Sequence, residues 1–225
     1  MALILSIETA TTNCSVALSE NGETILLKED NSKNYSHAER LHVFIDEVLK
    51  EQNLTTSDLD AIAVSKGPGS YTGLRIGVSA AKGLCFASDK PLISVPTLEA
   101  LAHQVLCNEG VIVAMLDARR MEVYSAIYDS KYNEIRTTEA QILDDTSFKS
   151  YLEQGKVYFI GNGVEKTKAL IHHPNAVFVE DKMPSANEMG HLAYNKYKKS
   201  DTENVAYFEP YYLKDFIALK PKPKV

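Results

Sequence analysis

The stretch Lys66–Cys85 reads KGPGSYTGLRIGVSAAKGLC, and the interpretation of the whole chain depends on it. It follows the apolar segment Asp60–Ser65 and predicts a buried strand, a glycine-rich loop and then a helix. Such a loop either points backbone amides at a phosphate, beside the positive end of the helix dipole, or starts a helix that contacts another protein. The first interpretation makes the chain an enzyme, and the second makes it a binding partner.

The loop does not match the familiar phosphate-binding patterns. The sequence lacks both the Walker pattern G-x-x-x-x-G-K-[ST] and a G-x-G-x-x-G with a lysine. The turn Glu8–Thr12, after the first strand, offers an acid and hydroxyls, which either hold a metal-bound phosphate or satisfy the backbone of the turn. The residue types leave both interpretations open. The candidate nucleotide- or phosphate-binding residues are Glu8, Thr9, Gly67, Gly69, Ser70 and Arg75.

The helix after the loop carries a face of small and apolar residues at helical spacing, namely Gly73, Gly77, Ala80, Ala81 and Leu84. Another helix can approach such a face closely, unless the face packs on the chain's own sheet. A second helix, from Ser36 to about Gln52, would complete this surface, and Ser36 with Glu39 forms the pattern of a capping box. The predicted partner-binding residues are Leu41, Ile45, Leu74, Gly77, Val78 and Ala81.

Apolar runs and turn signals outline the remaining elements. Asn21-Gly22 between two short apolar runs predicts a hairpin. Further strands are expected at 3–7, 91–95, 111–116, 122–128, after 133, at 158–160 and at 176–179, with helices at about 97–106, after 163 and at 185–198. The order predicts an α/β fold with mixed sheets flanked by helices, in two lobes of residues 1–106 and 107–225. The start of the first lobe recurs in the second, which reads as less complete.

Other signals for chemistry are weak. Asp117 ends a predicted buried strand, where it is either a catalytic acid held ionised by Arg119 and Arg120 or part of a salt-bridged turn. His37 and His42 are five positions apart, so they do not share one helix face, and no H-E-x-x-H pattern occurs. We expect no metal site.

The composition of the 225 residues is ordinary for a soluble globular protein. No apolar run reaches the roughly 20 residues of a membrane span, so the expected location is cytoplasmic. The net charge of −6 argues against direct nucleic-acid binding, because phosphate contacts need a basic face. The basic cluster is Lys220–Lys224, a solvated end or a contact with a polyanion held by a partner. The cysteines Cys14, Cys85 and Cys107 are expected to be free thiols.

Five segments together carry a resemblance to a known family. They are ILSIETATTNCSVAL, DLDAIAVSKGPGSYTGLRIGVSAAKGL, PLISVPTLEALAH, MLDARRMEVYSAIY and the closing FEPYYLK. This sequence resembles the bacterial TsaB (YeaZ) family, densely in its first half and thinly afterwards. The resemblance implies the two-lobed, actin-like (ASKHA, ribonuclease H-like) fold that sugar kinases share. It also implies a paralogue of TsaD that is not itself catalytic.

The implied function is support of a tRNA-modifying enzyme. TsaD transfers the threonylcarbamoyl group that makes N6-threonylcarbamoyladenosine at position 37 of tRNA, and TsaE is an ATPase of the same assembly. A TsaB-like chain is expected to pair with TsaD through helices of its first lobe, to self-pair when alone, and to meet tRNA only through the complex. No tightly bound cofactor is expected, although ATP or ADP at the assembled complex stays open.

The resemblance also bears on metal binding. TsaD-type proteins carry a His-x-x-x-His metal pair after the strand that corresponds to Pro91–Val95, and this chain has Thr97 and Leu101 at those positions. Neither side chain is a useful metal ligand. The alternative function is an ATP-dependent phosphotransferase or ATPase of the actin-like fold that acts on its own, with Glu8, Thr9 and Asp117 around the nucleotide. Whether the chain has any catalytic activity by itself therefore stays open.

Overall fold

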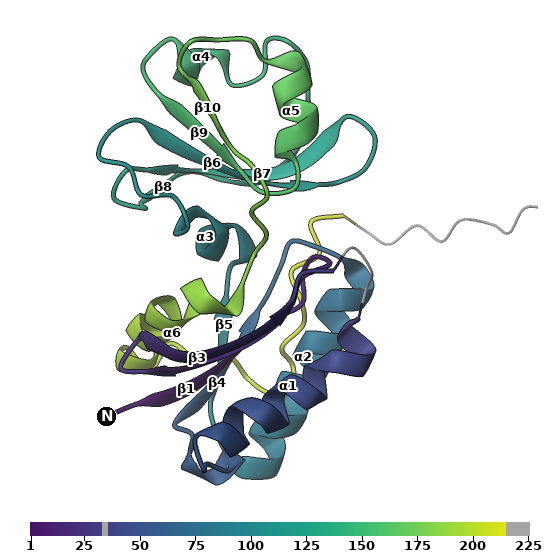
Figure 1. Cartoon of the computed structure of the whole chain (residues 1–225), viewed down its shortest axis with the longest axis vertical. Helices are drawn as coiled ribbons and strands as arrows, with labels where there is room; N and C mark the ends of the chain where they lie inside the picture. Colours follow the sequence, from purple (N-terminus) through teal and green to yellow (C-terminus); the bar gives the residue numbers. More distant parts are fainter. Residues whose placement is uncertain (33–35, 215–225) are drawn as a thin grey trace, which may run out of the picture.

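The computed structural model describes residues 1–32 and 36–214, which form two five-stranded sheets with helices packed on them (Figure 1). The first sheet has the order β3-β2-β1-β4-β5. Its strands are β1 (Leu3–Glu8), β2 (Cys14–Glu20), β3 (Glu23–Asp30), β4 (Ala61–Ser65) and β5 (Leu92–Val95). The β1–β2 and β2–β3 pairs are antiparallel, and β4 and β5 add in parallel, so the expected mixed sheet is confirmed.

The second sheet repeats this plan. Its order is β10-β9-β6-β7-β8, with antiparallel β6–β7 and β7–β8 pairs and parallel β9 and β10. Its strands are β6 (Val111–Asp117), β7 (Glu122–Asp129), β8 (Glu134–Ile142), β9 (Val157–Ile160) and β10 (Ala176–Val179). The predicted recurrence is therefore confirmed. The second lobe is reduced in its helices, α4 (Lys149–Leu152) and α5 (Val164–Leu170), and not in its strands.

The long helices α1 (His37–Glu51) and α2 (Tyr71–Ser88) cover one face of the first sheet. They lie side by side in Figure 1, where α3 (Thr97–Ala102) sits between the two sheets. Apolar residues of α1 and α2 share a core with alternate residues of β1 and β2, since side chains alternate between the faces of a strand. Among the described residues, no helix has the length and apolar character needed to cross a membrane.

The helix α6 (Met189–Lys198) covers the opposite face of the first sheet. Met189 and Ala193 share a core there with Ile4, Ala17 and Ile93. The predicted division at residue 106/107 thus separates the two sheets, but it assigns the last helix wrongly. The reason is that the chain returns to the first lobe after β10, where α6 packs on the first sheet and the Tyr211 amide bonds to the Lys66 carbonyl.

Helix ends also depart from expectation. Ser36 precedes α1, but its hydroxyl donates a hydrogen bond of 2.8 Å to Asp30 and does not cap the helix, so the predicted capping box is wrong. A capping box occurs at Thr55 and Asp58 instead, before a 3₁₀ turn. The predicted helix 97–106 ends early, at Ala102. The basic cluster Lys220–Lys224 lies outside the described residues.

Candidate functional site

The glycine-rich loop before α2 is closed by the chain's own backbone. A Cβ atom at Gly69 would lie 2.4 Å from the carbonyl oxygen of Ala10, in the turn after β1. The amide of Ser70 donates to that same carbonyl at 2.7 Å. The Ser70 hydroxyl caps α2 by accepting from the Gly73 amide at 3.2 Å. The close approach that Gly69 permits is therefore to protein backbone.

The C-terminal segment closes the other side of the loop. Gly67 has a φ of +108°, and a Cβ atom there would lie 2.8 Å from the carbonyl oxygen of Tyr211. The amide of Tyr211 donates to the Lys66 carbonyl at 2.7 Å, and the amide of Thr97 donates to the Gly67 carbonyl at 3.2 Å. These contacts favour the structural interpretation of the loop over phosphate binding.

The turn after β1 packs against the start of α2. Cβ atoms at Gly73 and Gly77 would lie 2.1 Å from the carbonyl oxygen and 2.2 Å from the hydroxyl oxygen of Thr9, respectively. Glu8 is fully buried at the end of β1, and this burial raises the pKa of its carboxyl to about 7. The amide of Ala10 donates to that carboxyl at 2.5 Å. The candidate residues Glu8 and Thr9 thus lie inside the fold.

The predicted partner-binding residues are also internal. All six are buried in the described structure: Leu41, Ile45, Leu74, Gly77, Val78 and Ala81. Their helix faces turn toward the chain's own sheet, where Val78 and Ala81 share a core with apolar residues of β4 and β1. The most apolar stripe of a surface helix faces its own core, so these six residues are not on the exposed surface of the chain, and their contact with a partner stays a prediction.

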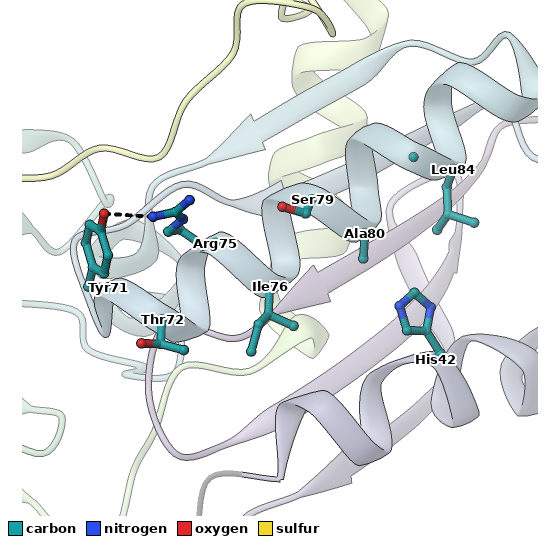
Figure 2. Close-up of a pocket in the computed structure, with 9 residues that line it drawn as sticks. His42, Tyr71, Thr72, Arg75, Ile76, Ser79, Ala80 and Leu84 are labelled. Atoms are coloured by element: carbon teal, nitrogen blue, oxygen red, sulfur yellow. Dashed lines mark hydrogen bonds between the residues drawn. The ribbon is translucent and has the colours of Figure 1, made fainter.

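The outward face of α2 forms a different surface with α1. A groove of about 720 Å³ lies there, and the sequence singled out only Arg75, Ala80 and Leu84 of its lining as candidate contact residues. The lining residues are His42 from α1 and Tyr71, Thr72, Arg75, Ile76, Ser79, Ala80, Gly83 and Leu84 from α2. Figure 2 shows Ile76, Ala80 and Leu84 pointing toward α1. The available signal was a second, weaker apolar stripe at these three positions, turned away from the first.

The guanidinium of Arg75, oriented by Tyr71, lies at one end of this groove. Arg75 is exposed, and its guanidinium donates to the Tyr71 hydroxyl at 2.9 Å and lies 5.4 Å from the centre of the Tyr71 ring (Figure 2). The Tyr71 ring in turn packs on Tyr212 of the C-terminal segment, with ring centres 5.0 Å apart. The guanidinium has a defined direction and forms no ion pair among the described residues. It is suited to a carboxylate or phosphate of another molecule.

Asp117 lies in a salt-bridged turn. Its carboxylate pairs with Lys166 of α5 at 2.7 Å, and its amide donates to the side-chain oxygen of Asn162 at 2.8 Å. Of the two interpretations of Asp117, a catalytic acid or part of a salt-bridged turn, the structure contains the salt bridge, and its partner is Lys166. Arg119 contributes its backbone amide, which donates to the Asp117 carboxylate at 2.6 Å, and neither Arg119 nor Arg120 forms an ion pair with Asp117 among the described residues.

Thr97 and Leu101 are committed to internal contacts. The hydroxyls of Thr97 and Ser65 share a hydrogen bond of 2.6 Å, and the amide of Gly67 donates to Thr97 at 3.1 Å. Leu101 is fully buried. Among residues 1–32 and 36–214, no three His, Cys, Asp or Glu side chains gather as a metal-ligand set.

Comparison with known proteins gives the family. The family model described as "TsaD: tRNA N6-adenosine threonylcarbamoyltransferase" matches residues 31–222. The Escherichia coli K12 protein "tRNA threonylcarbamoyladenosine biosynthesis protein TsaB" is 31% identical over 229 residues, which cover 98% of each chain. A "tRNA N6-adenosine threonylcarbamoyltransferase" from Staphylococcus saprophyticus is 44% identical over 108 residues, covering 41% of this chain and 32% of that protein.

Solved structures agree with the sequence matches. "YeaZ from Pseudomonas aeruginosa" superposes with a TM-score of 0.82 at 26% identity, covering 95% of this chain and all of that chain. This likeness supports the expected two-lobed, actin-like fold. The alternative of an ATP-dependent phosphotransferase acting alone finds no support in these matches. The full-length similarity to TsaB and the match of the TsaD family model show that the chain belongs to the TsaB (YeaZ) family.

Proposed function

We propose that this chain is the subunit that pairs with and activates a TsaD-type threonylcarbamoyltransferase in the synthesis of tRNA threonylcarbamoyladenosine. The observation that carries the proposal is the exposed groove between α1 and α2. Ile76 and Leu84 leave part of their apolar surface open there, beside the exposed His42 of α1. Two adjacent helices with such a groove can accept a further helix or helix pair.

The closed loop supports a pairing role over catalysis by the lone chain. Its backbone groups bond to Ala10, Thr97 and Tyr211, so the loop serves mainly to seat α2 on the sheet. An ATP or ADP role then belongs to the assembled complex, where a partner supplies further groups. Arg75 is the candidate residue of this chain that is placed to meet such a phosphate or a partner carboxylate.

The other partners follow from the same role. A TsaE-like ATPase joins the assembly, and the chain self-pairs through the groove when TsaD is missing. Contact with tRNA is indirect, in keeping with the net charge of −6. A role in tRNA modification implies a cytoplasmic location.

The first test is light scattering on this chain mixed with the TsaD-type protein of the same organism, beside each protein alone. We expect a heterodimer, and we expect Ile76→Asp to abolish it, because a carboxylate would be buried in the groove. Ile135→Asp is the matched control, since Ile135 is 49% exposed on β8 of the other lobe. Reconstituted tRNA modification should require the chain and fail with Ile76→Asp. The absence of any complex with the wild-type chain would refute the proposal.

A further inference from the structure

Gly83 on α2 has no role in the chain's own packing. A Cβ atom at this position would meet nothing within 4 Å, whereas Cβ atoms at Gly73 and Gly77 would collide with Thr9. Gly83 is exposed in the second turn from the end of the helix, with a right-handed φ. A glycine in an exposed helix interior destabilises the helix relative to alanine. The fold of the lone chain therefore gives no reason for this glycine.

A second groove lies on the other side of Gly83. It measures about 540 Å³, and Gly83 lines both this groove and the one between α1 and α2. Its lining residues are Lys82, Gly83, Phe86, Asn204, Val205 and Ala206. Phe86 is 86% exposed, and Tyr207, next to Ala206 in the chain, is 83% exposed. Two exposed aromatic side chains beside a groove are typical of a protein-binding surface.

One wall of the second groove is fixed by hydrogen bonds within the chain. The Lys82 amine donates to the carbonyl of Ala206 at 3.2 Å and to that of Phe208 at 2.9 Å. The amide of Glu203 donates to the Leu92 carbonyl of β5 at 2.8 Å. The segment that forms one wall is therefore bonded to both α2 and the sheet, so the groove exists before any partner arrives.

The charge of the residues that line the two grooves indicates which kind of partner would fit them. None of the lining residues in the described part of the chain is acidic, although the chain has 30 acidic and 24 basic residues. Arg75 and Lys82 contribute cations. A helix that carries carboxylates beside small or apolar residues complements this surface.

We propose that a helix of the TsaD-type partner, with an acidic and apolar face, crosses α2 directly over Gly83 and occupies both grooves. The inference rests on the proposed function and specifies its contact. The bare backbone at Gly83 lets the partner helix approach α2 more closely than the usual 8–10 Å between helix axes. Phe86 then packs against the partner on the far side of the crossing, and Arg75 faces it on the near side.

The test uses two substitutions at the crossing point, Gly83→Ala and Gly83→Leu. Both variants should keep or raise the melting temperature, because either residue favours a helix more than glycine does. Affinity for the TsaD-type subunit, measured by calorimetry, should fall modestly for alanine and by about tenfold or more for leucine, since added volume is not tolerated at a close crossing. Gly155→Ala is the matched control, because a Cβ atom at Gly155 also meets nothing within 4 Å.

A second variant tests the second groove independently. Phe86→Ala should weaken TsaD binding by about tenfold, as expected for an aromatic anchor. Ile142→Ala, at a residue 73% exposed on β8, should leave binding unchanged. Wild-type affinity for both Gly83→Leu and Phe86→Ala would overturn the inference while leaving the proposed function intact, provided that Ile76→Asp still abolishes the complex. Loss of self-association alone, with unchanged TsaD binding, would also overturn it, because the occupant would be a second copy of this chain.

Discussion

The hydroxyl of Thr9 donates a hydrogen bond of 2.8 Å to the backbone carbonyl of Gly73, so the turn after β1 is joined directly to the first turn of α2. Both groups are buried. This contact lies where the sequence suggested a phosphate-binding loop, and it explains why glycines are needed there. The residues that resemble a phosphate-binding loop fix the position of α2 on the sheet. That position determines where the outward face of the helix lies.

The first prediction concerns the glycines beneath α2. Gly77→Ala should destabilise the fold by about 1–3 kcal/mol, because a Cβ atom there would lie 2.2 Å from the Thr9 hydroxyl oxygen. Urea unfolding followed by circular dichroism measures this change. Gly83→Ala, in the same helix, is the control and should be neutral or stabilising. Equal stability changes for the two variants would contradict the packing described for Gly77.

The sheets could be predicted from sequence because their signals are local. Asn21-Gly22 marked the first hairpin, and continuous apolar runs marked the parallel strands. The position of α6 could not be predicted in this way. An amphipathic helix such as Met189–Lys198 shows that one face is buried, but not which of two sheets receives it.

The candidate site was only partly predictable for a related reason. Small residues on α2 indicated close packing, but the pattern does not say whether the neighbour is the chain itself or a partner. The stripe of Leu74, Val78 and Ala81 turned inward, and Ile76 and Leu84 remained at the surface. The sequence also does not distinguish Gly83 from Gly77, although a Cβ atom would meet nothing within 4 Å at Gly83 and would lie 2.2 Å from the Thr9 hydroxyl oxygen at Gly77.

A second prediction concerns pH and the buried carboxyl of Glu8. Its pKa in the folded chain is about 7, raised from 4.5 by burial, so the folded state binds the proton more tightly than the unfolded state does. The contribution of Glu8 to the free energy of unfolding is therefore fully present below about pH 4.5 and is lost as the pH rises to about 7. The total loss is on the order of 3 kcal/mol. Glu8→Gln should match the wild type at pH 4.5 and exceed its stability at pH 8. Urea unfolding across this pH range measures the difference, and a variant less stable at pH 8 would contradict the burial argument.

A third prediction concerns Arg75 as a charged contact. Arg75→Ala should leave the melting temperature nearly unchanged, because the side chain is exposed and bonds only to Tyr71 among the described residues. Affinity for the TsaD-type subunit should fall by about 1–3 kcal/mol, with a weaker dependence on salt than the wild type shows. Lys131→Ala, at an exposed position in the turn between β7 and β8, is the control. Unchanged affinity with normal tRNA modification would show that Arg75 contacts neither a partner carboxylate nor a phosphate.

The last prediction concerns a histidine pair near the junction of the lobes. His103 follows α3 and lies 4.4 Å, ring centre to ring centre, from His191 of α6, and it stacks at 4.0 Å on Tyr132 of the second lobe. Burial, aided by the nearby His191, lowers the pKa of His103 from 6.5 to about 4, so the unfolded state binds the proton more tightly. Stability from this group is present above about pH 6.5 and is lost as the pH falls toward 4, opposite in sign to the effect of Glu8. His103→Gln should therefore flatten the acid side of the stability profile, whereas His172→Gln, at an exposed position, should leave the profile unchanged. If His103→Gln left the acid side as steep as in the wild type, the loss of stability would have to come from other groups.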